Sequence, residues 1–415
     1  MQPYLTLEDV DISGRTVLVR VDINSPIDLT TGKVRSDTRI RLHAKTLKEL
    51  ADHGAKVVVL AHQGRKGDPD FVPLKSHAET LSRVLSRPVK YVEEVVGEKA
   101  AKAIKELKPG EILVLENVRF HPDEVVNRSP KEHAQSQLVK GLAALADLFI
   151  LDGFSVAHRS HASVVGFTQL LPSVAGRVME AELSIMDTIT KKVKKPFLCL
   201  LGGSKVEKGS DFVEFLLSKG VDLILTGGLA GNLLLYASGV NLGEANLAVL
   251  EKRRLLEHAE RMKEVLNQNP GRVRIPLDVA VKADGSRVEL KISELPSKYL
   301  IYDIGSETIS YYVDLIQEAE TIFVIGPLGV YEEEAFAKGT FEVFKAIAES
   351  KTFSVASGGH TVTALRQFEL AEKFTYVSIA GGAFLEYMTG KKLPGVECLK
   401  AAAKKWKRSD LKIQG

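Results

Sequence analysis

Short stretches rich in arginine and histidine recur through the first half of this 415-residue sequence. Each of four such stretches follows an apolar run, and together they contain Arg20, Asp22, Asn24, His62, Arg65, Asn117, Arg119, Asp152, His158, Arg159 and His161. The planar guanidinium group of arginine forms paired hydrogen bonds with phosphate or carboxylate. Any one arginine is more often a surface ion pair, but an arginine in every stretch predicts a site for a small polyanion. Arg39 and Arg41, which follow the first stretch, belong to the same prediction.

The fourth stretch, "DGFSVAHRSH", is open to two other interpretations. Two histidines with two residues between them can bind a metal, and an aspartate, a histidine and a serine can form a hydrolase site. No cysteine or further ligand spacing supports a metal, and no nucleophile motif surrounds the serines. We therefore expect Arg159 to bind an anion, with His158 and His161 as its neighbours.

In the second half of the sequence, the apolar runs are followed by glycine-rich motifs instead of arginine-rich ones. Five apolar runs are followed by motifs that contain Gly202, Gly203, Lys205, Gly227, Gly228, Asn232, Gly326, Gly329, Glu332, Gly358, Gly359, Thr361, Gly381 and Gly382. Glycine before a helix lets backbone N–H groups approach phosphate oxygens, and the helix dipole favours the anion. One glycine pair can simply turn the chain, whereas five such motifs predict a nucleotide site. No P-loop motif occurs and no G-x-G-x-x-G follows a strand, which disfavours a dinucleotide.

The elements that must position these residues are short strands. The nine apolar runs read "TVLVRVD", "KVVVLAH", "EILVLEN", "LFILDG", "FLCLLGG", "DLILTGG", "TIFVIGP", "FSVASGG" and "YVSIAGG". Runs of this kind are typical of strands buried on both faces of a parallel sheet. Helical patterns alternate with them, among them 36–53, 131–146, 246–267 and 331–349. This alternation predicts an α/β fold with two doubly wound, Rossmann-like parallel sheets, whose ligands bind beyond the carboxyl ends of the strands.

A division of the chain is expected near residue 172, because the chain is too long for one ordinary core. A long helical pattern starts there and ends in lysines, which favour the negative end of a helix dipole. We predict an anion-binding domain over 1–172, an interdomain helix over 173–195 and a nucleotide-binding domain over 196–390. The tail 391–415 is helix-like and basic and could pack back on either domain, and we group it with the first.

The composition is typical of a globular protein. Apolar residues make up 45% of the chain, charged residues 26%, and the mean hydropathy is near zero. No apolar run approaches the roughly 20 residues that cross a bilayer, and the N-terminus shows no secretory signal. Two cysteines, Cys199 and Cys398, exclude a disulfide framework and fit a reducing cytoplasm. The net charge of +3 is too small to predict nucleic-acid binding. We expect a cytoplasmic monomer with no nucleic-acid or membrane partner.

Taken in order, the motifs resemble those of the phosphoglycerate kinase family over nearly the whole chain. The ordered set is "RVDINSP", "AHQGR", "LENVRF", "DGFSVAHRSH", "LGGSKV", "TGG", "IPLDVAV", "DIG", "GPLGVYEEEAFAKGT" and "GGHT". The resemblance implies reversible phosphoryl transfer from 1,3-bisphosphoglycerate to ADP, which yields 3-phosphoglycerate and ATP. Mg²⁺ would accompany the nucleotide. Two domains joined by a helix are then expected to close on their ligands and to exclude water.

The resemblance also implies roles for single residues. Asp22 and Asn24 would hold the glycerate end of the substrate, and Arg39 would stabilise the transferring phosphoryl group. The non-transferred phosphate would be bound by His62, Arg65, Arg119 and Arg159. Lys205 and Gly359 would join Arg39 as catalytic residues. The nucleotide would be bound by Gly202, Gly203, Lys205, Gly326, Glu332, Gly358, Gly359, His360 and Thr361, with Glu332 at the ribose. The acceptor is a carboxylate, so no general base is required.

Three positions depart from the family pattern. Gly209 stands where a second lysine is usual, with Lys208 one residue early. Ile325 replaces the asparagine of the usual "NGP", and His360 replaces an aspartate that is linked to the metal. Mg²⁺ prefers oxygen ligands to imidazole. The sequence therefore does not identify the Mg²⁺ ligands. The nucleotide, water and a carboxylate such as Asp303 are the candidates.

Several other polar residues have simpler interpretations. His43, His53 and His77 lie within helical patterns, and we expect them to pack in the protein or lie on its surface. Asp278 is either a turn residue or a nucleotide contact, and His360 is either a residue at a helix start or a phosphate contact. Glu182 matches a glutamate of the family's interdomain helix.

Two other classes of function are compatible with parts of the pattern. An NAD-dependent dehydrogenase could use a two-domain α/β scaffold, but the missing dinucleotide motif argues against it. A non-enzymatic anion-binding or nucleic-acid-binding protein could use the arginines. These arginines are separated by glycine turns and lack interleaved aromatic residues, which disfavours nucleic-acid binding.

Overall fold

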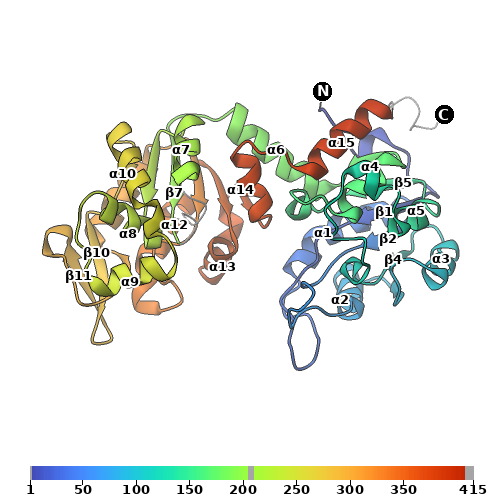
Figure 1. Ribbon diagram of the computed structural model, residues 1–415, viewed down its shortest axis with the longest axis horizontal. Coiled ribbons are helices and arrows are strands. Elements are labelled where there is room, and N and C mark those ends of the chain that lie inside the picture. Colours follow the sequence, from blue (N-terminus) through green and yellow to red (C-terminus); the bar gives the residue numbers. More distant parts are fainter. Residues whose placement is uncertain (1, 204–209, 407–415) are drawn as a thin grey trace. The chain divides into compact units, whose positions relative to one another are not determined.

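The computed structural model describes residues 2–203 and 210–406, and the chain divides into two compact units (Figure 1). Unit 1 comprises Met1–Met186 and Leu385–Gly415, and unit 2 comprises Asp187–Phe384. Helix α6 (Arg177–Lys191) contributes residues to both units. Each unit contains a parallel sheet of six strands with helices around it, so the predicted fold class is confirmed.

The sheet of unit 1 has the strand order β3-β4-β2-β1-β5-β6, and all its pairs are parallel. Its strands are β1 (Thr16–Arg20), β2 (Lys56–Leu60), β3 (Val89–Tyr91), β4 (Ile112–Val114), β5 (Leu148–Leu151) and β6 (Ser173–Ala175). Leu18 of β1 is level with Val58 on one side and Phe149 on the other, and all three are buried. Burial on both faces explains why the central strands are continuous apolar runs.

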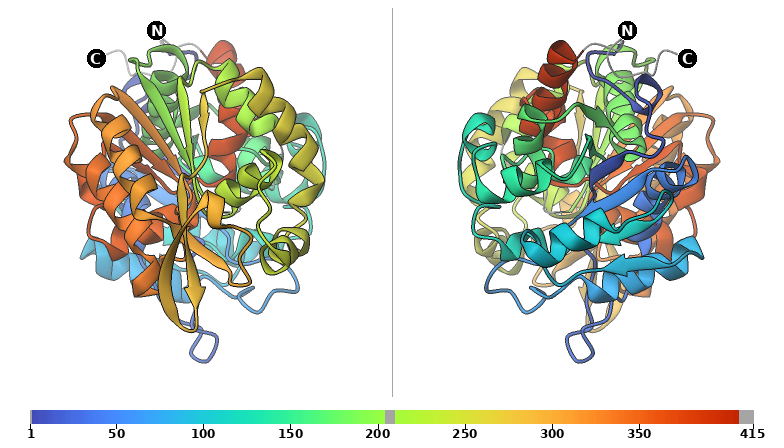
Figure 2. Two further views of the ribbon diagram at one scale, coloured as in Figure 1. Left: turned by 90° about the vertical axis from the view of Figure 1, so that its left-hand side faces the viewer. Right: turned by 90° about the vertical axis from the view of Figure 1, so that its right-hand side faces the viewer.

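Helices cover both faces of this sheet (Figure 2, right). Those of unit 1 are α1 (Thr38–Asp52), α2 (Lys75–Leu85), α3 (Glu98–Lys105), α4 (Pro130–His133), α5 (Gln137–Ala143) and α15 (Pro394–Lys405). The C-terminal helix α15 contacts β6, and Ala403 and Trp406 pack against the core of unit 1. The end of the chain therefore returns to the unit in which the chain begins.

The larger sheet of unit 2 has the order β15-β14-β13-β7-β8-β9 and is also parallel. Its strands are β7 (Phe197–Leu201), β8 (Leu223–Thr226), β9 (Val273–Arg274), β13 (Thr321–Ile325), β14 (Phe353–Ser357) and β15 (Tyr376–Ser378). A second, antiparallel sheet of three strands consists of β10 (Asp278–Ala283), β11 (Ser286–Lys291) and β12 (Ile301–Ile304).

Helices also lie on both faces of the parallel sheet of unit 2 (Figure 2, left). They are α7 (Ser210–Ser218), α8 (Gly228–Ala237), α9 (Glu244–Lys252), α10 (Ala259–Gln268), α11 (Ser306–Gln317), α12 (Lys338–Glu349), α13 (Gly359–Gln367) and α14 (Gly382–Met388), the last of which continues into unit 1. No helix of the described chain is long and apolar enough to cross a membrane.

All nine predicted strands are present, but the interdomain helix is shorter than the range 173–195. Residues 173–175 form β6, which pairs with β5 and extends the edge of the sheet. The helix begins at Arg177, where the backbone N–H of Val178 donates to the carboxylate of Asp152 at 2.9 Å. The edge strands β3 and β9 were not predicted, since two or three residues carry too little pattern.

Two predicted helices are broken by local capping chemistry. The range 131–146 separates into α4 and α5, because the Ser136 hydroxyl accepts from the backbone N–H of Val139 and starts a new helix. The range 246–267 divides into α9 and α10 around Arg254, which has a positive φ of 57°. Apolar periodicity predicts which face of a helix is buried, but it does not predict where the helix is interrupted.

Candidate active site

Asp22 lies just beyond β1 and is almost fully buried. Its carboxylate forms an ion pair with Arg39 from the first turn of α1 and accepts a hydrogen bond from the Ser155 hydroxyl. Burial by itself raises the pKa of Asp22, but the charge of Arg39 and the hydrogen bond from Ser155 lower that pKa well below its ordinary value. Asp22 is therefore ionised at neutral pH, and it holds the guanidinium group of Arg39 in place.

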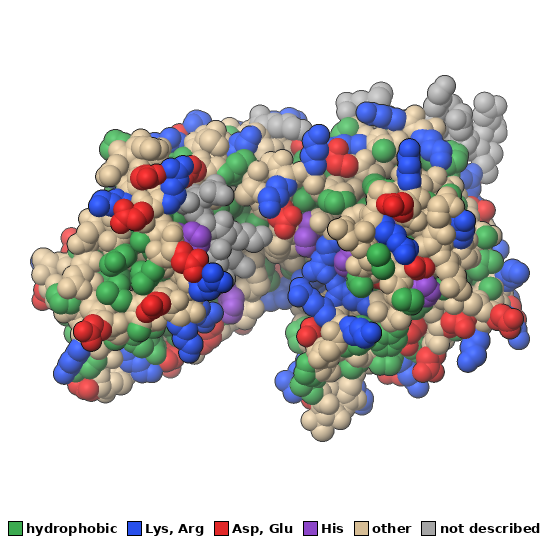
Figure 3. Space-filling model, viewed as in Figure 1, with side chains coloured by type: hydrophobic (Ala, Val, Ile, Leu, Met, Phe, Trp, Pro, Cys, Tyr) green, Lys and Arg blue, Asp and Glu red, His purple; other side chains and the backbone are tan. Residues whose placement is uncertain are grey.

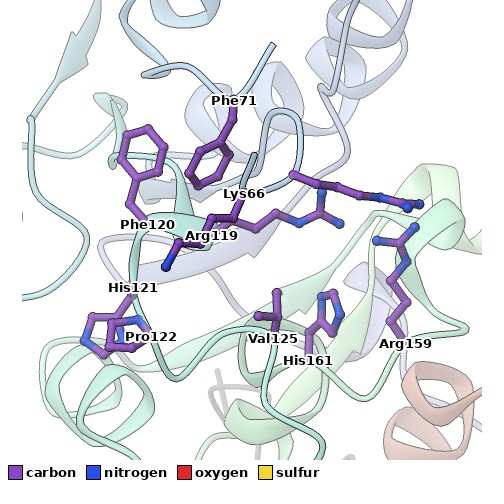
Figure 4. Close-up of a pocket in the computed structure, with 10 residues that line it drawn as sticks. Lys66, Phe71, Arg119, Phe120, His121, Pro122, Val125, Arg159 and His161 are labelled. Atoms are coloured by element: carbon purple, nitrogen blue, oxygen red, sulfur yellow. The ribbon is translucent and has the colours of Figure 1, made fainter. Parts of the chain in front are cut away.

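Three of the predicted anion-binding arginines line one cavity of about 740 Å³. Arg65 follows β2, Arg119 lies in a short 3-10 turn after β4, and Arg159 follows β5. Parallel strands place their carboxyl ends at one edge of the sheet, which brings these side chains together. In Figure 4, Arg159 and His161 lie at one end of the cavity, and the rings of Phe71 and Phe120 lie at the other.

The arginines of the cavity lower one another's pKa values. Burial and the nearby charges of Arg159 and Arg20 lower the pKa of Arg119 to about 10. Burial and Arg65 lower the pKa of Arg159. These shifts leave every guanidinium charged at neutral pH. Figure 3 shows lysine and arginine side chains gathered beside histidines on unit 1. Because like charges repel, an anion between them would be favourable.

Two histidines at this site are neutral. His62 is almost fully buried, and burial followed by the charge of Arg20 lowers its pKa well below the ordinary value. His161 lines the cavity, and burial followed by Arg20 and Arg159 lowers its pKa to about 3. The positive charge of the site therefore comes from arginine and lysine, and the histidines contribute hydrogen-bonding atoms.

Asn24 and Asn117 organise the loops around the cavity. The side-chain oxygen of Asn24 accepts from the backbone N–H of Gly64 at 3.0 Å, which connects the turns after β1 and β2. Asn117 is fully buried, donates to the carbonyl of Gln63 at 2.8 Å and accepts from the backbone N–H of Arg119 at 3.1 Å. Asn117 is a structural residue, and Asn24 keeps its amide N–H groups for a ligand.

Two sequence-based expectations about this region were wrong. Arg20 was expected at the surface of the anion site with the other arginines, but it is fully buried. Arg41 forms an exposed ion pair with Asp37, although it was grouped with the binding arginines. All these arginines follow an apolar run or begin the helix after it, so the sequence does not distinguish them. Only the surrounding structure shows which arginines can reach a ligand.

His43 is a connecting residue rather than a simple packing residue. Its Nδ1 lies 2.5 Å from the carboxylate of Asp152, and its Nε2 accepts from the backbone N–H of Asp22 at 3.2 Å. Asp152 also accepts from Thr46 at 3.0 Å and from the start of α6. The spacing of His43 four residues after Arg39 on α1 was a usable signal, because such residues share a helix face. Glu124 lies in none of the quoted motifs, and Ser155 and Ser163, inside and just after "DGFSVAHRSH", were not predicted as site residues.

In unit 2, the turns after β7 and β13 pack directly on each other. The backbone N–H of Gly202 donates to the carbonyl of Ile325 at 2.7 Å, and that of Gly203 donates to Pro327 at 2.8 Å. A Cβ atom on Gly202 would lie 2.1 Å from the carbonyl oxygen of Pro327, and one on Gly326 would lie 2.3 Å from that of Gly202. These glycines are required by the close approach of two backbones.

The turn after β14 is open instead. Gly358 precedes α13 with a φ of 104°, and a Cβ atom on Gly359 would meet no described atom within 4 Å. The hydroxyl of Thr361 accepts from the N–H of Gly326 at 2.7 Å and donates to the carbonyl of Ser357 at 2.8 Å. Thr361 thus joins two turns, while the first backbone N–H groups of α13 are accessible to an anion.

Glu332 and His360 extend from neighbouring turns of unit 2. Their side chains are 55% and 75% exposed, with Nδ1 of His360 3.9 Å from a carboxylate oxygen of Glu332. Both are thus accessible to a ligand. Lys205 was predicted to be catalytic, but it lies outside the described residues, as do Lys208 and Gly209. Glu182 is buried in α6.

Asp303, which was considered as a metal ligand, and Asp278, which was considered as a nucleotide contact, both have structural partners. Asp303 has a fully buried side chain that forms an ion pair with Arg287 at 2.8 Å and accepts from the N–H of Gly339 at 2.7 Å. Asp278 accepts from the N–H groups of Glu307 and Thr308 at the start of α11. Within residues 2–203 and 210–406, no three His, Cys, Asp or Glu side chains gather as a metal site.

Comparisons with known proteins agree with this description. The family model of phosphoglycerate kinase matches residues 7–391. The phosphoglycerate kinase of Methanobacterium bryantii is 44% identical over 96% of this chain and 97% of its own length. The phosphoglycerate kinase of Methanothermus fervidus is 43% identical over 98% of this chain and 99% of its own length. The crystal structure of the phosphoglycerate kinase from Pyrococcus horikoshii OT3 matches with a TM-score of 0.90 at 38% identity, covering 97% of this chain and 100% of that one.

Proposed function

The chain belongs to the phosphoglycerate kinase family, and we propose how its residues carry out the reaction of that family. The reaction transfers a phosphoryl group reversibly from 1,3-bisphosphoglycerate to ADP and yields 3-phosphoglycerate and ATP. The cavity that brings Arg65, Arg119 and Arg159 together is the observation that best supports the substrate site. Three guanidinium groups exceed the charge of roughly −1.5 to −2 on one non-transferred phosphate, so they can neutralise it fully.

The glycerate end of the substrate would be held by Asp22, Asn24 and His62. Asp22 is ionised and can accept a hydrogen bond from the substrate hydroxyl, while the Asn24 amide group can donate one. His62 would donate to a phosphate or carboxylate oxygen as a neutral ring. These three residues lie at the ends of β1 and β2, next to the turn that carries Arg65.

Arg39 would stabilise the transferring phosphoryl group. Such a group spreads negative charge over its equatorial oxygens in the transition state, so catalysis consists mainly of positioning and electrostatics. The ion pair with Asp22 fixes one side of the guanidinium group, and 30% of the Arg39 side chain is exposed to a ligand. A fixed charge requires little reorganisation when the reaction occurs.

The nucleotide would bind at the glycine-rich turns of unit 2. The open start of α13 at Gly358 and Gly359 would bind phosphate oxygens through backbone N–H groups and the helix dipole. Gly202, Gly203 and Gly326 would form the adjoining backbone surface, with Thr361 holding it in shape. Glu332 would bind the ribose and His360 would lie beside the phosphates. We retain Lys205 as a catalytic cation.

Mg²⁺ would arrive with the nucleotide. The described residues do not fit a resident metal site, because one carboxylate oxygen of Asp303 is paired with Arg287, the other is buried without a second ligand beside it, and no cluster of ligands is present among them. When bound, Mg²⁺ supplies positive charge at the β- and γ-phosphate oxygens. The contribution of the protein is to bind both substrates, to place Arg39 and to exclude water.

A coupled assay with 3-phosphoglycerate, ATP and Mg²⁺ tests this function directly. We expect turnover that depends on all three, with no reduction of NAD⁺ by any hydroxy acid. A protein that binds ADP but gives no product would contradict the proposal. We also propose a monomer, which light scattering of the purified protein can test.

A further inference from the structure

Arg20 ends β1 behind the substrate cavity, and its guanidinium group is fully buried. Its Nε donates to the Ser163 hydroxyl at 2.7 Å, and its Nη1 donates to the carbonyl of Val21. Its Nη2 lies 3.1 Å from Nδ1 of His62. A guanidinium group has donors only, so Nδ1 of His62 must be the acceptor. The single proton of the neutral ring therefore resides on Nε2.

Glu124 provides the negative charge for this buried cation. Its side chain is fully buried and accepts from both the backbone N–H of Ser163 at 2.8 Å and the Ser163 hydroxyl at 2.7 Å. The same hydroxyl accepts from Arg20, so one serine joins the two charges. Nδ1 of His161 lies 3.6 Å from the Glu124 carboxylate. A buried cation without such an anion would be strongly unfavourable.

We propose that Arg20, Ser163 and Glu124 are positioning residues that hold His62 in its Nε2–H tautomer, so that this proton is donated to the substrate anion. The inference rests on the proposed role of His62 in substrate binding. None of the three positioning residues lies among the cavity-lining residues in the described part of the chain. They therefore act on the substrate indirectly, in this proposal through His62 and its orientation.

The charges around His62 keep its ring neutral. Arg20 on β1, Arg119 after β4 and Arg159 after β5 are cations that lower its pKa in addition to the larger effect of burial. Asp22 is the anion that opposes them. Because burial and the three cations outweigh Asp22, the His62 ring stays neutral throughout the physiological pH range. The donor at Nε2 is therefore present regardless of small changes in pH.

The tautomer can be measured without any turnover. The full chain is labelled with ¹⁵N-histidine, and the His62→Gln variant assigns the signals of His62. We expect a protonated Nε2 and an unprotonated Nδ1 between pH 6 and 8. A proton on Nδ1, or a doubly protonated ring at pH 7, would overturn the inference. The coupled assay of the unmodified enzyme tests the proposed function separately, so the two failures are distinguishable.

Variants test whether the set acts on the substrate. In Ser163→Ala the bridge between Arg20 and Glu124 is lost, and we expect KM for 3-phosphoglycerate to rise roughly tenfold while kcat and KM for ATP change by less than about twofold. Ser160→Ala is the matched control, because its hydroxyl donates to Arg128 instead. Equal effects of the two variants on KM, or an equal rise of both KM values in Ser163→Ala, would refute a positioning role.

Arg20→Met gives a further readout. Without the cation beside Nδ1, we expect the pKa of His62 to rise and KM for 3-phosphoglycerate to depend more strongly on pH than in the unmodified enzyme. The same pH dependence of KM in this variant and in the unmodified enzyme would overturn the role of Arg20. If Arg20→Met does not fold, Glu124→Gln replaces it, and there the ¹⁵N signals of His62 must change while those of His53, just after the end of α1, stay the same.

Discussion

Unit 1 presents charged side chains to its proposed ligand, whereas unit 2 presents mainly backbone. The arginines of unit 1 are oriented by buried partners such as Asp22 and Gly64. The turns of unit 2 are shaped by glycines whose backbones approach each other so closely that a side chain would collide. Both sites lie beyond the carboxyl ends of parallel strands, yet they differ in what fixes their geometry.

The difference is what the proposed assignment of one ligand to each unit would require. A three-carbon bisphosphate has little besides its charge, so guanidinium groups with fixed positions give both affinity and orientation. A nucleotide has a larger surface and phosphates that also bind Mg²⁺, so neutral N–H groups at a helix start suffice. Substitutions in the two units should therefore fail in different ways.

Arg39→Ala should have the largest effect, a loss of about 10³-fold in kcat, because a guanidinium group at a transferring phosphoryl group is removed. ADP affinity, measured by calorimetry, should change by less than about twofold, since the proposed nucleotide site lies in the other unit. Arg41→Ala is the control, because Arg41 lies on the same helix turn with an exposed ion pair. Turnover of Arg39→Ala within a few-fold of the unmodified enzyme would disprove the assignment.

Alanine substitutions at two glycines of unit 2 should distinguish an effect on stability from an effect on nucleotide binding. Gly326→Ala should lower the melting temperature by several degrees, because an alanine at a φ of 84° costs roughly 1–3 kcal/mol in addition to its collision with Gly202. Gly359→Ala should leave the melting temperature unchanged, since the space is open, but should raise KM for ADP about tenfold if that space belongs to a phosphate. An unaltered KM in Gly359→Ala would place the phosphates elsewhere.

Acid should weaken unit 1 and strengthen unit 2. The lowered pKa values of His62, His77 (about 4) and His161 (about 3) mean that the unfolded chain binds more protons below pH 6.5, so stability falls as pH falls. Each histidine accounts for up to about 1.4 kcal/mol per pH unit, and the raised pKa of Glu124 opposes them in part. In unit 2, burial raises the pKa of Asp303 to about 6, and stability there rises as pH falls below 6.

Hydrogen exchange at pH 7 and pH 5, corrected for intrinsic rates, measures this contrast unit by unit. We expect faster exchange in the strands of unit 1 at pH 5 and no such increase in those of unit 2. His77→Gln should reduce the change in unit 1 and leave unit 2 as it was. Acceleration of the same size in both units would contradict the assigned pKa shifts.

Salt should produce the smallest effect. Raising the NaCl concentration from 50 to 500 mM should raise KM for 3-phosphoglycerate by about three- to fivefold and KM for ADP by less, because screening acts mainly on the exposed guanidinium groups of unit 1. Steady-state kinetics with Mg²⁺ held in excess measures both values. A stronger dependence for ADP would reverse the comparison between the units.

Much of the site could be predicted from the sequence, because residues just after apolar runs reach one edge of a parallel sheet. Arg65, Arg119 and Arg159 are the clearest case, since strand periodicity and side-chain chemistry were both visible. Arg20 looked identical by these criteria and is nevertheless buried. The roles of its partners Glu124 and Ser163 could not be predicted, because they lie 39 residues apart in the sequence and meet only in the fold.

The sequence by itself determined the α/β class, the nine principal strands, the arginine and glycine character of the two units, and the family. These features depend on local composition and on periodicity, which a linear chain carries. Only the tertiary structure decided which charged groups are buried, which glycines are forced by backbone contact, and on which nitrogen His62 carries its proton. These properties depend on desolvation and on contacts between distant segments, so they exist only once the chain has folded.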